Sequence, residues 1–282
     1  MISRLKIRCA LAAMVLLGGA LAVGMAQATT VASGFDANTL PANDDGSTGL
    51  VSLPFTINFY GTDYSDLYVN NNGNVTFNAP QSTFTPFGLG SSYSGQPIIA
   101  PFFGDVDTRG AGSGLTSYGN GSYAGHTAFG VTWPGVGYYN SHTDKLNTFQ
   151  LIMVDRSDTG VGNFDFYFNY DQIQWETGDA SSGSGGLGGI SAAVGYNAGQ
   201  SGNPAGTYAM LAGSLINGAL LDGGPNSLVA GSNDGVAGQF LFQVRNGSVV
   251  PPVTGVPEPG SLGMLALGLL ALGWLARRRR YA

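Results

Sequence analysis

Two aspartates near the middle of the chain, Asp105 and Asp107, have the type and spacing of a small metal site. On a strand, residues i and i+2 point to one face, about 6.6 Å apart along the chain. The pair would offer Ca²⁺ two carboxylate oxygens, and Asp44 and Asp45 are further candidates. Arg109 favours a second interpretation, in which it pairs with Asp107 and ties a strand end to a loop. We favour the second interpretation, expect no cofactor, and keep calcium as the alternative.

Catalytic chemistry has little support in the residue types. An inverting glycosidase uses two separated carboxylates, but two aspartates on one face of one strand lie side by side and do not flank a sugar. His126 and His142 belong to no metalloprotease motif, and neither a G-x-S-x-G nucleophile nor a phosphate-binding G-x-x-x-x-G-K occurs. The sequence therefore predicts a protein that is not an enzyme.

Three aromatic residues are candidates for ligand contact: Trp133, Tyr138 and Tyr139. Aromatic rings stack on apolar faces such as those of sugars. The Tyr138-Tyr139 pair follows Pro134-Gly135 and is the first to examine. Residues of this kind are more often core or outward-facing strand positions, and that is the interpretation we favour.

Strands are the elements that must position these residues. Residues 54–61 alternate apolar and polar side chains, and Asn70-Asn71-Asn72-Gly73 separates two alternating runs as a tight hairpin turn does. In residues 164–170 alternation places Phe164, Phe166, Phe168 and Tyr170 on one face. Further strands are expected at 98–103, 127–133, 149–154, 192–196 and 239–245. The pattern predicts an all-β fold, a β-sandwich of antiparallel strands with long Gly/Ser-rich loops.

The segments between these strands are rich in turn residues. Residues 178–189 are nearly all Gly and Ser and predict a flexible loop inside the domain. Residues 208–221 fit either a short helix or a strand. Residues 247–256 contain Pro251 and Pro252 and predict a stiff, extended, proline-rich linker.

The N-terminal residues 1–28 have the organisation of a signal peptide with a signal helix. Basic residues precede the apolar run 10–23, and Ala26 and Ala28 supply the small residues of a signal peptidase site. The chain is therefore expected to be exported. Its single cysteine, Cys9, lies inside this segment, so the mature protein is expected to contain no disulfide.

The C-terminal residues 257–282 have the organisation of a sorting signal. Val256, Pro257, Glu258 and Pro259 form an extended junction, because proline disfavours helix in itself and in the residue before it. The apolar run 261–276 predicts a transmembrane helix, and the arginines after it form a membrane stop: Arg277, Arg278, Arg279 and Arg280.

This C-terminal segment closely resembles the PEP-CTERM signal, from Val256 to Ala282. The resemblance implies an exosortase-type processing protease as a partner, in a bacterium with two membranes. It also implies contact with the membrane through the C-terminal helix before processing. We expect transient anchoring in the inner membrane, followed by a place at the cell surface or in the extracellular matrix.

The part between the two signals is strongly acidic. Residues 29–259 contain 17 acidic residues and four basic ones, a net charge of −13. Such a surface repels phosphates, so no nucleic acid partner is expected and anionic lipid is disfavoured. Cations or neutral glycans suit it better.

Several linked motifs of the middle segment are similar to the NIDO domain of nidogen and related proteins. They are residues 67–77 (LYVNNNGNVTF), 99–108 (IAPFFGDVDT), 147–151 (NTFQL) and 170–175 (YDQIQW). Phe103 stands where the family more often has tryptophan, which keeps a large aromatic side chain. The resemblance implies an extracellular, non-enzymatic module over residues 50–246, with residues 29–49 as a lead-in.

Together these features predict an exported cell-surface or extracellular-matrix protein, for example of a biofilm. Its expected role is cell–matrix adhesion through the NIDO-like domain. The expected ligands are extracellular polysaccharide or matrix and surface proteins. Two alternatives stay open, a secreted carbohydrate-active enzyme and a passive structural protein of the matrix.

Overall fold

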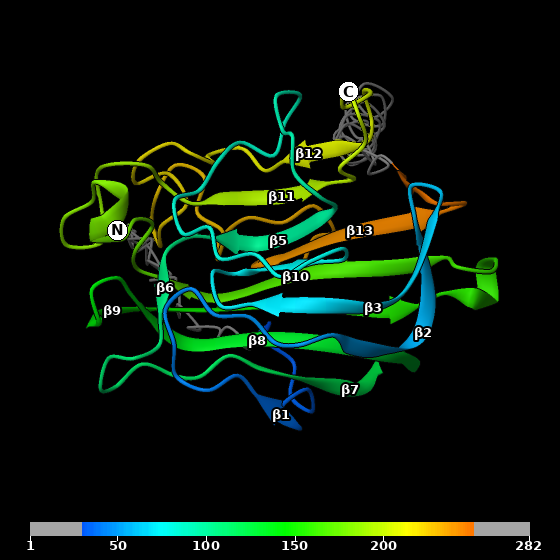
Figure 1. The fold of residues 1–282 in the computed structure, drawn as a ribbon, viewed down its shortest axis with the longest axis horizontal. Coiled ribbons are helices and arrows are strands. Elements are labelled where there is room, and N and C mark those ends of the chain that lie inside the picture. The colour runs from blue at the N-terminus through cyan, green and yellow to red at the C-terminus, as the bar shows by residue number, and fades with distance from the viewer. Residues whose placement is uncertain (1–29, 251–282) are drawn as a thin grey trace, which may run out of the picture.

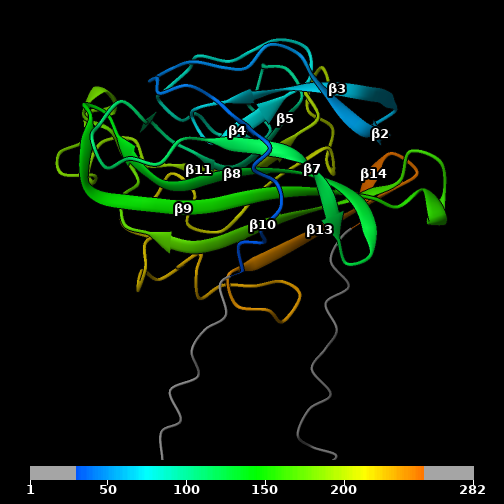
Figure 2. The same ribbon diagram turned by 90° about the horizontal axis from the view of Figure 1, so that it is seen from below.

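Two antiparallel β-sheets pack face to face in the computed structural model, which describes residues 30–250 (Figures 1 and 2). The described helical elements are two short 3-10 turns, η1 (Ser157–Thr159) and η2 (Asp179–Ser181). The predicted all-β sandwich is confirmed. The signal helix and the transmembrane helix fall outside the described residues.

The larger sheet has the strand order β1-β7-β8-β9-β10-β13-β14, with β6 also paired to β8. Its strands are β1 (Asn38–Thr39), β6 (Val106–Asp107), β7 (Ser117–Tyr123), β8 (His126–Tyr138), β9 (His142–Asp155), β10 (Phe164–Ile173), β13 (Gln239–Arg245) and β14 (Ser248–Val250). The smaller sheet has the order β12-β11-β5-β4-β3-β2. Its strands are β2 (Val51–Phe59), β3 (Thr62–Asn70), β4 (Asn74–Thr76), β5 (Ile98–Phe103), β11 (Ala193–Asn197) and β12 (Tyr208–Met210).

Strand β10 shows how alternation places the core. Its aromatic side chains at every second position are all buried, as the sequence predicted. Phe166 lies opposite Phe242 of β13, and the two rings stack with centroids 4.7 Å apart. Tyr196 of β11, in the smaller sheet, packs against Phe166 in an edge-to-face arrangement, with ring centroids 5.8 Å apart. The main core therefore fills the space between the two sheets.

The outer face of the larger sheet is covered as well. Ala32 donates its backbone N–H to Gln150 of β9 at 3.0 Å, so the segment before β1 lies along this face. Phe35 packs there where Gly121 and Gly130 lack side chains; a Cβ on Gly130 would lie 2.4 Å from the Phe35 ring. Because β7 is rich in Gly, Ser and Asn, its sequence did not indicate a strand, yet its glycines make room for Phe35.

Some elements differ from their predicted bounds. Strand β8 continues past Pro134 to Tyr138, because a register shift between Trp133 and Val136 accommodates the proline. The ambiguous segment 208–221 begins as strand β12 and continues as turns. The predicted linker begins with β14, which pairs with β13. The Gly/Ser-rich segment 178–189 is a loop, as predicted, and contains η2 and several backbone hydrogen bonds.

Candidate functional site

Three segments far apart in the sequence meet at one corner of the sandwich. They are the loop 43–47, the turn 70–74 between β3 and β4, and the link 104–105 between β5 and β6. The amide of Asn71 joins them: its Nδ2 donates to the backbone oxygens of Asp44 and Val106, at 2.6 Å each. Asn71 is itself buried, and its backbone oxygen accepts from Trp133 Nε1 at 2.9 Å. The corner is therefore fixed by polar contacts within the protein.

The turn that carries these asparagines requires glycine. Gly73 has φ of +75°, and a Cβ there would lie 1.7 Å from the backbone oxygen of Phe102. The close approach lets Asn72 face the other two segments. Its Oδ1 accepts from the N–H of Val106 at 3.0 Å, and its Nδ2 donates to Asp45 Oδ1 at 2.8 Å. Asn72 therefore holds one carboxylate in place.

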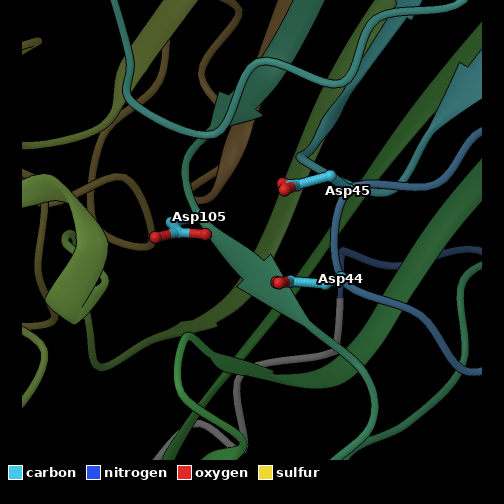
Figure 3. Close-up of side chains that lie close together, drawn as sticks. All are labelled: Asp44, Asp45 and Asp105. Carbon is cyan, nitrogen blue, oxygen red and sulfur yellow. The ribbon is translucent and has the colours of Figure 1, made fainter.

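Three carboxylates converge at this corner, and we name Asp44, Asp45 and Asp105 the acidic corner (Figure 3). One oxygen from each lies within 4.8 Å of the others. Asp105 is 1 % exposed, and neither of its carboxylate oxygens has a hydrogen-bond partner within residues 30–250. Asp44 Oδ1 also lacks a partner there. The acidic corner is thus a built cluster of oxygens with unused acceptor capacity.

Electrostatics agree with this geometry. Burial, followed by the charges of neighbouring aspartates, raises the pKa of Asp105 to about 7. Burial and the charges of Asp45 and Asp107 raise the pKa of Asp44 to about 6, although Arg109 opposes the shift. Both carboxylates are thus held where the charged form is disfavoured.

Asp107 has the opposite surroundings. Arg109 donates to it from its backbone N–H and Nε, both at 2.9 Å, and its Nη2 donates at 2.6 Å. The N–H of Ser141 adds a bond of 2.8 Å. Burial alone would raise the pKa of Asp107, but these hydrogen bonds outweigh it and lower the pKa below its usual value. The expected pairing with Arg109 is therefore present, and Asp105 associates with Asp44 and Asp45 instead of forming a site with Asp107.

The three candidate aromatic residues are not one exposed platform. Trp133 and Tyr138 are buried in the core, which corrects their assignment as ligand contacts and agrees with the favoured core interpretation. Trp133 stacks on Phe149 with centroids 5.0 Å apart. Tyr139 is half-buried, and Arg109 Cζ lies 6.0 Å from its ring centroid. Of the three, only Tyr139 keeps part of its ring at the surface.

Neither histidine is a member of the acidic corner. His142 Nε2 lies 2.9 Å from Asp179 Oδ2 in an exposed pair, and its ring stacks on Tyr138 at 4.8 Å. His126 opens strand β8 opposite Tyr123. Three surface pockets of about 320 to 380 Å³ occur elsewhere, and none of the three is lined by Asp44, Asp45 or Asp105.

Other predicted site residues fall outside the described part of the chain. These are the signal cleavage residues Ala26 and Ala28, the junction Val256 to Pro259, and the arginines 277–280. Within residues 30–250, the structure contains no helix long and apolar enough to cross a membrane.

Sequence reasoning missed the polar residues that build the corner. Asn70, Asn71, Asn72 and Asn74 are fully or almost fully buried, although the run was assigned only to a turn. A turn needs at most one or two such side chains, so four asparagines within five residues were the available signal.

Comparisons with known proteins find matches for two parts of the chain, the sandwich domain and the C-terminal segment. The nidogen-like domain family matches residues 65–246, and the PEP-CTERM protein-sorting motif matches residues 255–280. Mouse alpha-tectorin is 33% identical over 243 residues, which cover 78% of this chain and 10% of that protein. Drosophila melanogaster nidogen is 30% identical over 224 residues, covering 71% of this chain and 15% of that protein. The chain thus spans 10 to 15% of the length of these relatives, and no solved structure matches it.

Proposed function

Because the chain belongs to the nidogen-like domain family and carries a PEP-CTERM sorting motif, we propose that it is an exported adhesion protein of a bacterial surface or matrix. One observation carries this proposal: the two features occupy adjoining parts of one chain, residues 65–246 and 255–280. The nidogen-like domain provides a binding module, and the sorting motif directs the protein out of the cytoplasm. The matrix of a biofilm is the setting that combines them.

The sorting half of the proposal concerns processing. An exosortase-type protease cleaves near Val256 to Pro259 after the apolar run has held the precursor in the inner membrane. The arginines 277–280 remain on the cytoplasmic side, because positively charged residues resist transfer across the bilayer. The domain then reaches the cell surface or the extracellular matrix.

The binding half rests on the relatives and on charge. Alpha-tectorin and nidogen are extracellular matrix proteins, and this chain shares with them the region that forms the sandwich. Since the chain covers only a small part of either, their other activities are not transferred. The net charge of −13 in residues 29–259 favours uncharged polysaccharide, or matrix and surface proteins with basic patches, and disfavours nucleic acid.

A carbohydrate-active enzyme is less well supported by the same geometry. Asp44 and Asp105 are close together with raised pKa values, a pattern that acid–base catalysis also uses. However, Asp105 is almost fully buried, so a glycan cannot reach its carboxylate without rearrangement. A binding role needs no such movement.

Retention and turnover distinguish these roles. The full-length chain, purified in mild detergent, is passed over immobilised exopolysaccharide from the producing cells and over a panel of neutral polysaccharides. We expect reversible retention and no release of reducing ends. Release of reducing ends would show the enzyme, and absence of both retention and release would leave a passive structural role.

Processing is checked by the intact mass of the extracellular form. We expect this form to lack the residues after the Pro257-Glu258-Pro259 junction. Replacing all four terminal arginines with serine should weaken retention of the precursor in the membrane. An extracellular form that still ends at Ala282 would exclude processing at this junction.

A further inference from the structure

We propose that the acidic corner binds one divalent cation of the calcium class, with Asp44, Asp45 and Asp105 as its carboxylate ligands. This site goes beyond the adhesion role proposed above and does not depend on it. Of the candidates that the sequence suggested, it keeps Asp105, Asp44 and Asp45 and leaves out Asp107, which pairs with Arg109.

The spacing of the oxygens fits one ion. Ca²⁺ binds oxygen at about 2.3 to 2.6 Å, so two ligands on opposite sides of it lie about 5 Å apart. One oxygen from each of the three aspartates lies within 4.8 Å of the others. Figure 3 shows the side chains of Asp44 and Asp45 directed toward Asp105 across a common space. A single ion in that space can contact all three.

Asp105 provides an independent observation. It is 1 % exposed, and both of its carboxylate oxygens are without a hydrogen-bond partner in the described part of the chain. Buried polar atoms are normally paired, and a buried charge without a partner is costly. All the charged neighbours that affect its pKa are aspartates, and each of them raises it. The surroundings of Asp105 therefore lack a positive charge that a cation would supply.

The nearby arginine does not fill this role. Arg109 makes three hydrogen bonds to Asp107 and reaches the acidic corner only through Asp44 Oδ2, at 3.0 Å. Asp44 Oδ1 stays without a partner among the described residues. One oxygen of Asp44 is thus bound to Arg109, and the other is free for a metal.

The ligands are held before any ion arrives. Asn72 Nδ2 positions Asp45 Oδ1, and Asn71 Nδ2 holds the backbone oxygen of Asp44. Asp105 is fixed on the other side, because its backbone oxygen accepts from the N–H of Tyr139 at 3.1 Å. An ion here would tie the loop 43–47 to the link between β5 and β6, and so join the N-terminal lead-in to the sandwich.

Calcium suits this corner better than magnesium. Mg²⁺ requires near-octahedral geometry at about 2.0 to 2.1 Å and usually keeps several waters, so it is rarely held by an all-protein cage. Ca²⁺ accepts six to eight oxygens in a flexible arrangement. Asp44 and Asp45 are half-buried, which leaves access for water on the solvent side.

Calorimetry and thermal unfolding test the site on the full-length chain in mild detergent, treated with chelator and then given Ca²⁺ or Mg²⁺ at equal ionic strength. Unfolding is followed by tryptophan fluorescence, since Trp133 and Trp175 are fully buried. We expect one Ca²⁺ per chain and a rise in Tm of about 5 to 10 °C at a hundredfold excess over Kd. Mg²⁺ should produce a much smaller rise.

Matched variants assign the effect to the corner. Asp105→Asn should abolish both the calcium binding heat and the calcium-dependent rise in Tm. Asp36→Asn removes the same charge from an exposed position before β1 and should keep both. If Asp105→Asn does not fold, Asp45→Asn serves instead, with the same expected loss. The site is overturned by absence of calcium binding to the wild type, by equal Tm shifts with the two ions, or by a calcium shift that survives in the corner variant.

Discussion

The protein buries aspartate in two regions and surrounds it in opposite ways. On β10, Asp165 is 1 % exposed and lies between two arginines, with Arg156 Nη1 at 2.8 Å and Arg245 Nη1 at 2.6 Å. At the acidic corner, Asp105 is equally buried and faces other carboxylates. The first region balances its charge with Arg156, which directly follows β9, and with Arg245 of β13. In the second, Arg109 reaches only Asp44 of the three aspartates, and neither carboxylate oxygen of Asp105 has a partner within residues 30–250, which identifies it as the place where an external cation would act.

The largest effect is expected in the core beneath the first region. Phe166→Ala removes a ring that stacks on Phe242 and contacts Tyr196 of the other sheet, and should lower the free energy of unfolding by about 3 to 5 kcal/mol. Urea unfolding measures the loss. A loss below about 1 kcal/mol would show that this face contributes little to the core.

The next effect concerns the balanced aspartate itself. Asp165→Asn leaves Arg156 and Arg245 without their shared carboxylate, and should cost about 3 kcal/mol, because breaking a buried ion pair leaves unpaired charge. Asp158→Asn is the matched control, since it removes an exposed partner of Arg156 and should cost much less. Equal losses in the two variants would contradict the view that burial makes the Asp165 pairs important.

The two regions should respond to the same substitution with changes of opposite sign in the free energy of unfolding. Without calcium, Asp105→Asn removes a buried charge that has no partner, and should raise the free energy of unfolding by about 1 kcal/mol. Asp165→Asn should lower it. Urea unfolding in chelator measures both. If Asp105→Asn is as destabilising as Asp165→Asn, the carboxylate of Asp105 has a structural partner and the contrast between the regions fails.

The smallest effect concerns another buried carboxylate, Glu176, which is bound by backbone groups. It accepts from the N–H groups of Gly218 and Leu220, both at 2.6 Å. Burial raises the pKa of Glu176, and these bonds oppose the shift only in part. A carboxyl whose pKa is higher in the folded state favours folding most at low pH, and this contribution is lost as the pH rises through the folded-state pKa.

Unfolding of wild type and Glu176→Gln at several pH values measures this contribution. We expect the stability of the wild type relative to the variant to fall as the pH rises above about 4.3, the usual pKa of glutamate. Parallel curves for the two proteins over this range would contradict the prediction.

Much of the fold could be predicted from local patterns. Alternation identified β10 and β13, and Asn72-Gly73 identified the β3–β4 hairpin, because side-chain periodicity and turn chemistry depend on neighbours in sequence. The glycine-rich strand β7 was not predicted. Its glycines leave room for Phe35, which is distant from β7 in the sequence. Asp165 and Asn169 lie on the face of β10 opposite its buried aromatic residues at 164, 166, 168 and 170. Both are buried, because residues outside the two-sheet core cover the outer face of β10.

In the candidate site too, contacts between neighbours in sequence could be predicted, and contacts between distant residues could not. The spacing of Asp105, Asp107 and Arg109 is local, and the sequence therefore predicted the Asp107–Arg109 pair correctly. The partners of Asp105 lie about 60 residues earlier, at Asp44 and Asp45, and no local pattern connects them.

The sequence by itself determined the strands with regular alternation, the PEP-CTERM motif and the membership of the nidogen-like family, since each is written in contiguous residues. The tertiary structure alone decided which buried carboxylates lie beside an arginine side chain and which lie beside other carboxylates. Charge balance depends on distances of a few ångströms between side chains, and only the packing of the loop 43–47 against the β5–β6 link brings the three aspartates of the acidic corner that close.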